Sequence, residues 1–242
     1  MKRILLFGTF TNYFARFVVM LCNYGTSVYI ARMLGPNQYG IYAIIFTVLN
    51  LLSLMSTTGI LSATSKYVAH MPAQASAVKN SAFKLTGLIA LIFAGAFFFL
   101  TIPISDLLRD RTLSPYLRMT TLVIIPFFLY PVFLGYFNGL KKYHKQAIIK
   151  VIFAVANFIL IVGFVYLGFE IYGAIVGFAL GALIACLTGY FMAGRIKLTA
   201  GFSMKKLLLF AIPFTILSFT FVGTRSISLL LVKSLLGDNN LT

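Results

Sequence analysis

Three cations lie inside long apolar stretches of this sequence: Arg16, Lys150 and Arg225. A charge near the middle of a membrane-spanning helix costs about 2.5–3.5 kcal/mol on insertion, so such residues bind a ligand, pair or reach back to the membrane surface. Arg16 lies about 12 Å inside its stretch at 1.5 Å per residue. We therefore expect a water-filled cavity at Arg16, with surface contact or structural pairing as the alternative. Lys150 lies near the end of its stretch, where reaching the surface is favoured, and Arg225 suits either position.

No Asp or Glu accompanies these cations within the apolar stretches. A pump for cationic drugs, or one driven by protons through a carboxylate, needs an acid inside the membrane. An interior with cations only favours an anionic cargo, because a planar guanidinium can bind two phosphate oxygens at once. Asparagines within the stretches are candidates to line the same cavity, and hydrogen bonding between helices is an equally good explanation. They are Asn12, Asn23 and Asn157.

The composition of the chain is that of a membrane protein. Of its 242 residues, 60% are hydrophobic and 10% are charged, and the mean hydropathy is +0.98. Soluble domains are about 45–50% apolar and about 25% charged, so a soluble domain, a disordered chain and a disulfide scaffold are excluded. The net charge of +16 sits mostly at the ends of the apolar stretches, which indicates membrane orientation and no nucleic-acid partner. Cys22 and Cys186 lack metal-ligand spacing, and we expect no metal and no cofactor.

Seven stretches are long enough to cross a bilayer, which takes about 20 residues. They cover residues 8–30, 41–62, 85–104, 120–137, 147–167, 171–193 and 207–231. The predicted fold class is therefore all-α, a polytopic transmembrane helix bundle. The N-terminus and the segments after the second, fourth and sixth stretches carry most of the Lys and Arg residues, and all four acidic residues lie on the other side. This asymmetry predicts a multi-pass protein of the cell membrane with its N-terminus in the cytoplasm.

The sequence contains a weak internal repeat. Residues 1–7 read MKRILLF and residues 204–210 read MKKLLLF, while residues 34–37 read LGPN and residues 236–239 read LGDN. Two matches in the same order at nearly the same separation indicate that the seventh stretch begins a second copy of the first six. We predict a six-span lobe over 1–200 and the first helix of a truncated second lobe over 201–242. The chain is then a fragment, a split gene product or an interrupted reading frame.

Three segments resemble polysaccharide-biosynthesis flippases, the Wzx-like transporters of the multidrug/oligosaccharidyl-lipid/polysaccharide (MOP) exporter superfamily. The segment ARMLGPNQYGIY at 31–42 resembles the turn after the first helix of these proteins. GYFNGLKK at 135–142 and EIYGA at 170–174 are similar to two weaker features. The resemblance covers the N-terminal half of a family member.

The resemblance implies a MATE-like, two-lobed transporter that works by alternating access and is not an enzyme. Its cargo would be an oligosaccharide linked to polyprenyl diphosphate, moved to the outer leaflet for cell-surface polysaccharide biosynthesis. The partners are then the membrane lipid, this anionic lipid-linked oligosaccharide and, where the second lobe is separate, a second polypeptide. We expect Arg16 and Arg225, on equivalent first helices of the two lobes, to hold the diphosphate in a shared cavity.

Three alternatives remain open at this point. The first is a drug or toxin exporter of the same superfamily, which the missing membrane carboxylates disfavour. The second is a polytopic glycosyltransferase or polymerase that uses Asp106, Asp110 or Glu170, although the short loops leave little room for such a site. The third is an inactive or regulatory half-transporter.

Overall fold

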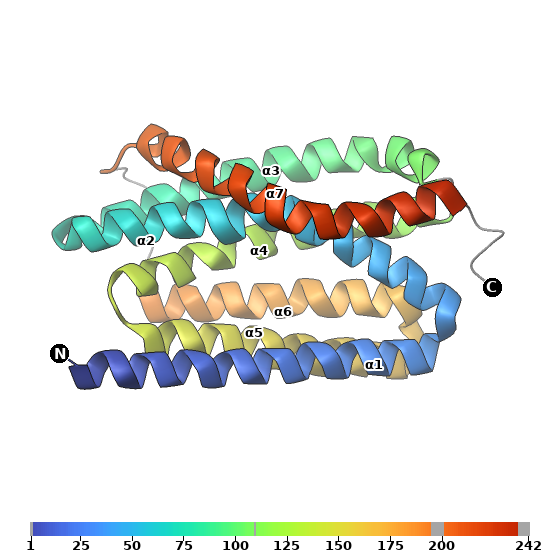
Figure 1. The fold of residues 1–242 in the computed structure, drawn as a ribbon, viewed down its shortest axis with the longest axis horizontal. Helices are drawn as coiled ribbons and strands as arrows, with labels where there is room; N and C mark the ends of the chain where they lie inside the picture. The colour runs from blue at the N-terminus through green and yellow to red at the C-terminus, as the bar shows by residue number, and fades with distance from the viewer. Residues whose placement is uncertain (1, 109, 195–200, 237–242) are drawn as a thin grey trace.

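The chain forms a bundle of long helices. The computed structural model describes residues 2–108, 110–194 and 201–236, with side chains between residues 10 and 220 of those ranges (Figure 1). The α-helices are α1 (Lys2–Leu54), α2 (Leu61–His70), α3 (Ala75–Leu107), α4 (Leu113–Gly139), α5 (Tyr143–Phe164), α6 (Glu170–Ala193) and α7 (Met204–Leu236). Two π-helices, η1 (Met55–Ile60) and η3 (Val165–Phe169), and one 3-10 helix, η2 (Pro72–Gln74), connect them.

Two glycine turns divide the longest helical stretches into separate spans. Gly35 interrupts α1 with φ 77° and ψ 175°, and Gly168 has φ 88° at the end of η3. Both backbone conformations lie in the region that glycine adopts without strain. The chain reverses direction at each turn (Figure 1). We call residues 2–34 the N-terminal arm of α1 and residues 36–54 its C-terminal arm.

The helices agree with the seven predicted spans. The described part of the chain has four continuous helical stretches apolar enough to cross a membrane, from Phe10 to His70, Pro72 to Leu107, Leu113 to Gly139 and Tyr143 to Ala193. The first and last of these stretches contain the two reversals and hold two spans each. The seventh predicted span lies in α7. The all-α membrane bundle is confirmed, whereas the domain division at residue 200 stays a prediction.

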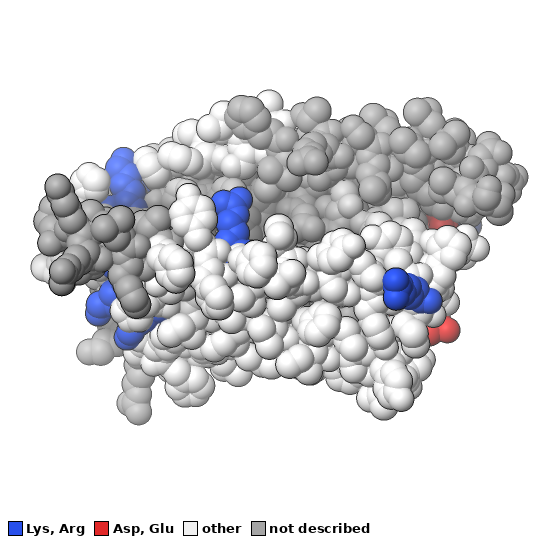
Figure 2. Space-filling view, turned by 60° about the horizontal axis from the view of Figure 1, so that its bottom comes forward, with Lys and Arg blue, Asp and Glu red and all other residues white. Residues whose placement is uncertain are grey.

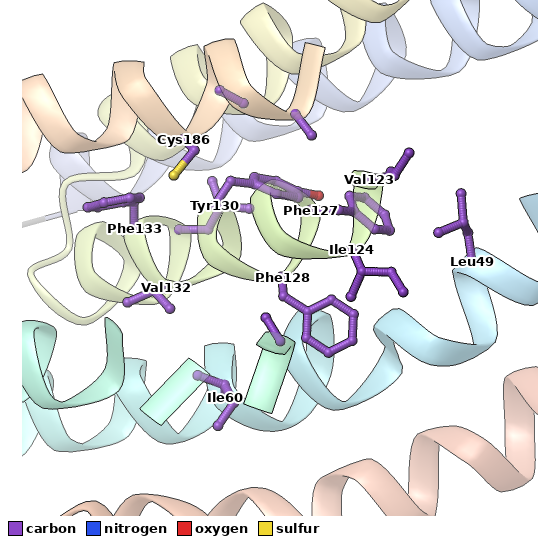
Figure 3. Close-up of a cluster of buried hydrophobic side chains, with 14 of the residues drawn as sticks. Leu49, Ile60, Val123, Ile124, Phe127, Phe128, Tyr130, Val132, Phe133 and Cys186 are labelled. Carbon is purple, nitrogen blue, oxygen red and sulfur yellow. The ribbon is translucent and has the colours of Figure 1, made fainter. Parts of the chain in front are cut away.

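Helix α4 forms the centre of the bundle. It lies between a layer of α2, α3 and α7 and a layer of α5, α6 and the N-terminal arm of α1 (Figure 1). Phe128 of α4 points toward the layer that carries Ile60, while Tyr130 lies toward Cys186 of α6 (Figure 3). The core of the lobe is thus built on both sides of one helix, which fixes the position of α4 relative to its neighbours.

Large apolar side chains remain exposed on the outside of the bundle. Phe99 is 78% exposed, Leu91 60% and Phe10 71%. Soluble monomers rarely expose many large apolar side chains together on one surface. Contact with lipid explains such a surface. The protein is a multi-pass membrane protein.

The acidic side chains are confined to one end of the bundle in the view of Figure 2. Most of the visible lysines and arginines lie toward the opposite end, and one basic patch lies beside the acidic side chains (Figure 2). The positive end also holds the α4–α5 turn, where Lys141 and Lys142 are exposed. We call these the basic end and the acidic end of the molecule.

Candidate binding cavity

A cavity of about 670 Å³ lies between α1, α4 and α5, near the basic end. The N-terminal arm of α1 contributes Asn12, Tyr13, Arg16 and Val19. Helix α4 contributes Tyr130, Leu134 and Asn138. Helix α5 contributes Tyr143, Gln146, Lys150 and Phe153. Consecutive lining residues of α4 and α5 are three or four positions apart, the spacing that places them on one face of a helix.

Two cations line the cavity from opposite helices. Arg16 belongs to α1 and Lys150 to α5, and they are close enough for their positive charges to repel each other. None of the described lining residues is an Asp or Glu. The salt bridge found among the described side chains joins Arg111 to Asp106, at the acidic end. Two cations in an apolar bundle without a carboxylate partner leave room for an anion to neutralise them.

Amide and aromatic side chains complete the cavity wall. Gln146 is only 6% exposed and lines the cavity from α5. The Asn138 amide donates a hydrogen bond of 3.0 Å to Ser65 Oγ of α2. Tyr130 and Phe153 stack with their ring centroids 4.7 Å apart. The cavity therefore offers positive charge, polar amides and flat apolar surface within one space.

Not all of the predicted site residues meet here. Arg16, Lys150 and Asn12 line the cavity, but Asn23 does not and is exposed farther along α1. Asn157 is buried against Gly181 of α6, where its Oδ1 has no hydrogen-bond partner among the described residues. The reason is that α5 and α6 pack too closely at this depth for a cavity to extend between them.

The side chain of Arg225 lies outside the described residues. That Arg225 helps to form a shared cavity therefore stays a prediction. The binding roles of Arg16 and Lys150 stay predictions as well.

Five polar residues line the cavity without having been predicted as site residues. They are Asn138, Tyr143, Gln146, Tyr13 and Tyr130. The first three lie at the ends of spans, where polar residues are ordinary and carry no signal of their own. The spacing of residues 143, 146, 150 and 153 could have identified the lining of α5. These positions are three or four residues apart and therefore share one helix face with Lys150, the cation that the sequence places inside the membrane.

One further cation has a structural role. Lys79 of α3 is 1% exposed, and its Nζ donates hydrogen bonds of 3.1 Å and 2.9 Å to the carbonyl oxygens of Ala193 and Gly194. These carbonyl oxygens end α6, and the last turn of a helix attracts positive charge. The position of Lys79 at the basic end thus reflects the capping of α6 as well as membrane orientation.

The acidic residues proposed for the alternative enzyme site are engaged elsewhere. Asp106 accepts a hydrogen bond of 2.8 Å from Arg111, and Glu170 accepts one of 3.1 Å from Gln38. Asp110 accepts a hydrogen bond of 3.0 Å from the backbone N–H of Thr112. Each carboxylate stabilises a turn at the acidic end, and none lines the cavity that the structure describes.

The sequence model of the family described as "Polysaccharide biosynthesis protein" matches residues 5–241. The chain belongs to this family. Among curated proteins, this family member is similar to the stage V sporulation protein B of Bacillus subtilis (strain 168), with 30% identity over 158 residues. That alignment covers 62% of this chain and 30% of the relative.

Two of the solved structures with the same fold are membrane transporters by their descriptions. The family member is similar to an inward-facing multidrug resistance MATE family transporter of the MOP superfamily, with a TM-score of 0.71, 17% identity and coverage of 89% of this chain and 53% of that chain. It is also similar to a MOP superfamily transporter from Pyrococcus furiosus, with a TM-score of 0.70, 19% identity and coverage of 91% and 54%. The MATE-like fold expected from the resemblance is confirmed. This chain spans about half the length of these transporters.

Proposed function

We propose that this protein takes part in the transport of a polyprenyl-diphosphate-linked oligosaccharide across the cell membrane, and that it is not an enzyme. The cargo enters from the cytoplasmic leaflet, and its diphosphate binds between Arg16 and Lys150. The cations of the basic end face the cytoplasm, as the bias of Lys and Arg toward cytoplasmic segments favours. A second lobe, in the same or a separate polypeptide, closes the cavity from the other side and contributes its own cations.

The observation that carries the proposal is the meeting of two cations in a cavity without a carboxylate. Three features of a lipid diphosphate match this cavity. It is a multivalent anion, its lipid can stay in the surrounding bilayer, and its phosphate oxygens suit both a guanidinium fork and a point charge. A cationic drug has the wrong charge for these walls, so the cavity favours the polysaccharide branch of the superfamily over drug export.

The proposal is tested by complementation in cells that lack the gene for this chain. We expect Arg16→Ala and Lys150→Ala to abolish or strongly reduce export of surface polysaccharide, with normal amounts of protein in the membrane. Removal of a charge-assisted contact costs about 1.5–3 kcal/mol, or roughly a tenfold to hundredfold loss in binding. Arg32→Ala is the matched control, because Arg32 is exposed on α1 and does not line the cavity.

Full export by Arg16→Ala together with Lys150→Ala would contradict the proposal. The proposal would also be contradicted if the wild-type protein confers resistance to cationic drugs and deletion of its gene leaves polysaccharide export unchanged.

A further inference from the structure

A cluster of aromatic and basic side chains holds the start of α7 against α2 at the basic end. The ring of Tyr67 lies 5.0 Å from the ring of Phe202 and 6.0 Å from that of Phe210, measured between centroids. Lys66 Nζ lies 3.9 Å from the centroid of Phe210, where the face of an aromatic ring attracts a cation. The Tyr67 hydroxyl donates a hydrogen bond of 3.4 Å to the carbonyl oxygen of Lys206. We call Lys66, Tyr67, Phe202 and Phe210 the clasp.

Only the first part of α7 buries side chains in the lobe. The helix packs on α2 and η1 (Figure 1), and Leu207 and Ala211 are 0% exposed. By contrast, none of residues 214–220 is buried. Contact with the lobe is therefore concentrated in residues 204–212, which we call the clasped segment. We call residues 214–220 the outer segment.

Both helices are weakened at the level where the clasped and outer segments join. Pro213 lies inside α7 and has no N–H for the carbonyl oxygen four residues earlier, so the helix bends there most easily. The neighbouring element η1 is a π-helix, a geometry that is rare and frequent at functional sites. A Cβ atom added to Gly59 of η1 would lie 2.9 Å from the carbonyl oxygen of Ala211. The two weakened elements therefore touch almost backbone to backbone.

The π-helix η1 is itself attached to the centre of the bundle. Ser56 Oγ donates a hydrogen bond to the carbonyl oxygen of Phe128 in α4, and both Ser56 and Gly59 are buried. Because α4 is fixed by packing on both of its sides, η1 offers α7 a fixed point of contact. A helix that is fastened before a proline and unburied after it can change its angle at the proline while its first part stays in place.

We propose that α7 is a jointed helix. The clasped segment moves as part of the first lobe, and the outer segment changes its angle at Pro213, with Gly59 as the point of contact. The boundary between the two moving parts of the transporter then lies inside α7 and not near residue 200, where the internal repeat places it. A change of angle at Pro213 would open or close the acidic end without disturbing the basic end of α7. The joint does not depend on the identity of the cargo.

The joint is tested by pulsed electron paramagnetic resonance on the full chain in nanodiscs, in a background without Cys22 and Cys186. Two pairs of spin labels are placed at exposed positions, a clasped pair at His70→Cys with Leu209→Cys and an outer pair at Asn50→Cys with Phe219→Cys. We expect one narrow distance for the clasped pair. For the outer pair we expect two distances or one broad distribution, because only the outer segment changes its angle.

Two variants, each with a matched control, identify the cause. Pro213→Ala restores the missing N–H and should remove the second distance of the outer pair, whereas Pro103→Ala makes the same change inside α3 and should leave that distance in place. Lys66→Ala combined with Tyr67→Ala removes the clasp and should add a second distance to the clasped pair. Tyr166→Ala, at an exposed position of η3, should keep the clasped pair narrow.

The wild-type measurement alone can overturn the joint. One narrow distance in both pairs would show that α7 is rigid. Two distances in both pairs would show that the whole of α7 moves, and would return the boundary to the start of this helix. A second outer distance that persists in Pro213→Ala would place the bend elsewhere, and a clasped pair that stays narrow without Lys66 and Tyr67 would show that the clasp does not hold α7.

Discussion

At the scale of single residues, cations in this protein have two different environments. Lys79 is buried and its ammonium group is satisfied by two carbonyl oxygens at the end of α6. Arg16 and Lys150 face a cavity and have no carboxylate beside them. A charge that the protein itself satisfies stabilises the fold, whereas a charge that faces an open space is available to a ligand.

The structural role of Lys79 predicts a loss of stability on substitution. Lys79→Met removes two hydrogen bonds from a charged donor to the carbonyl oxygens of Ala193 and Gly194, which costs about 1.5–3 kcal/mol. The sequence has no Trp, so unfolding is best followed by the reaction of a thiol dye with the buried Cys186 of α6, in a Cys22→Ser background. Lys84→Met on the same helix is the control and should unfold at the wild-type temperature. Equal unfolding temperatures for both variants would show that the capping of α6 is dispensable.

At the scale of helices, close approach depends on missing side chains. A Cβ atom added to Gly135 of α4 would lie 2.6 Å from the carbonyl oxygen of Leu61, and one added to Gly177 of α6 would lie 2.8 Å from the backbone N of Ile161. Small residues allow such approach between membrane helices, where van der Waals packing drives association. This close packing fixes the rotation of α4 and α5 about their axes. It therefore decides which of their side chains face the cavity.

We therefore expect Gly135→Ala to destabilise the protein, although alanine normally favours a helix by about 1 kcal/mol over glycine. The added methyl group would force α4 away from α2. The matched control is Gly95→Ala in α3, where an added Cβ meets nothing within 4 Å, so this change should be neutral or stabilising. The Cys186 assay measures both. If Gly135→Ala were as stable as Gly95→Ala, the close contact between α4 and α2 would be absent.

The sequence predicted the positions of the helices along the chain better than the rotation of each helix about its own axis. Hydropathy places the seven spans because it depends on length and composition alone, and the cost of burying charge singles out Arg16 and Lys150. Helix rotation depends on neighbours that lie far away in the sequence. Asn157 faces α6 and Asn23 is exposed, so neither lines the cavity that their polarity suggested. Gln146 was missed because polar residues at the end of a span are expected there in any membrane protein.

At the scale of the whole molecule, charge distinguishes the two ends of the bundle. The basic end includes the α4–α5 turn. Asp106 and Asp110 belong to the α3–α4 connection and Glu170 begins α6, and both of these segments lie at the other end (Figure 1). Because the cavity opens near the basic end, orientation decides which leaflet supplies the cargo. Loading from the cytoplasmic leaflet requires the basic end to face the cytoplasm.

Orientation can be measured with single cysteines in a background without Cys22 and Cys186. A membrane-impermeable thiol reagent added to intact cells should label Asp106→Cys and leave Lys142→Cys unlabelled, because positively charged segments stay in the cytoplasm. Both positions are exposed, so both should react once the membrane is permeabilised. The reverse pattern in intact cells would place the cavity at the outer leaflet and contradict the proposed direction of loading.

The central claim is that a diphosphate-bearing lipid binds between Arg16 and Lys150. Photocrosslinking with a polyprenyl diphosphate that carries a photoreactive group beside the phosphates tests it most directly. The account predicts that mass spectrometry finds crosslinked peptides of α1 around Arg16 and of α5 around Lys150, and that excess unlabelled polyprenyl diphosphate suppresses them whereas polyprenol does not. Crosslinks confined to lipid-exposed residues such as Leu91 and Phe99, unaffected by the competitor, would contradict it.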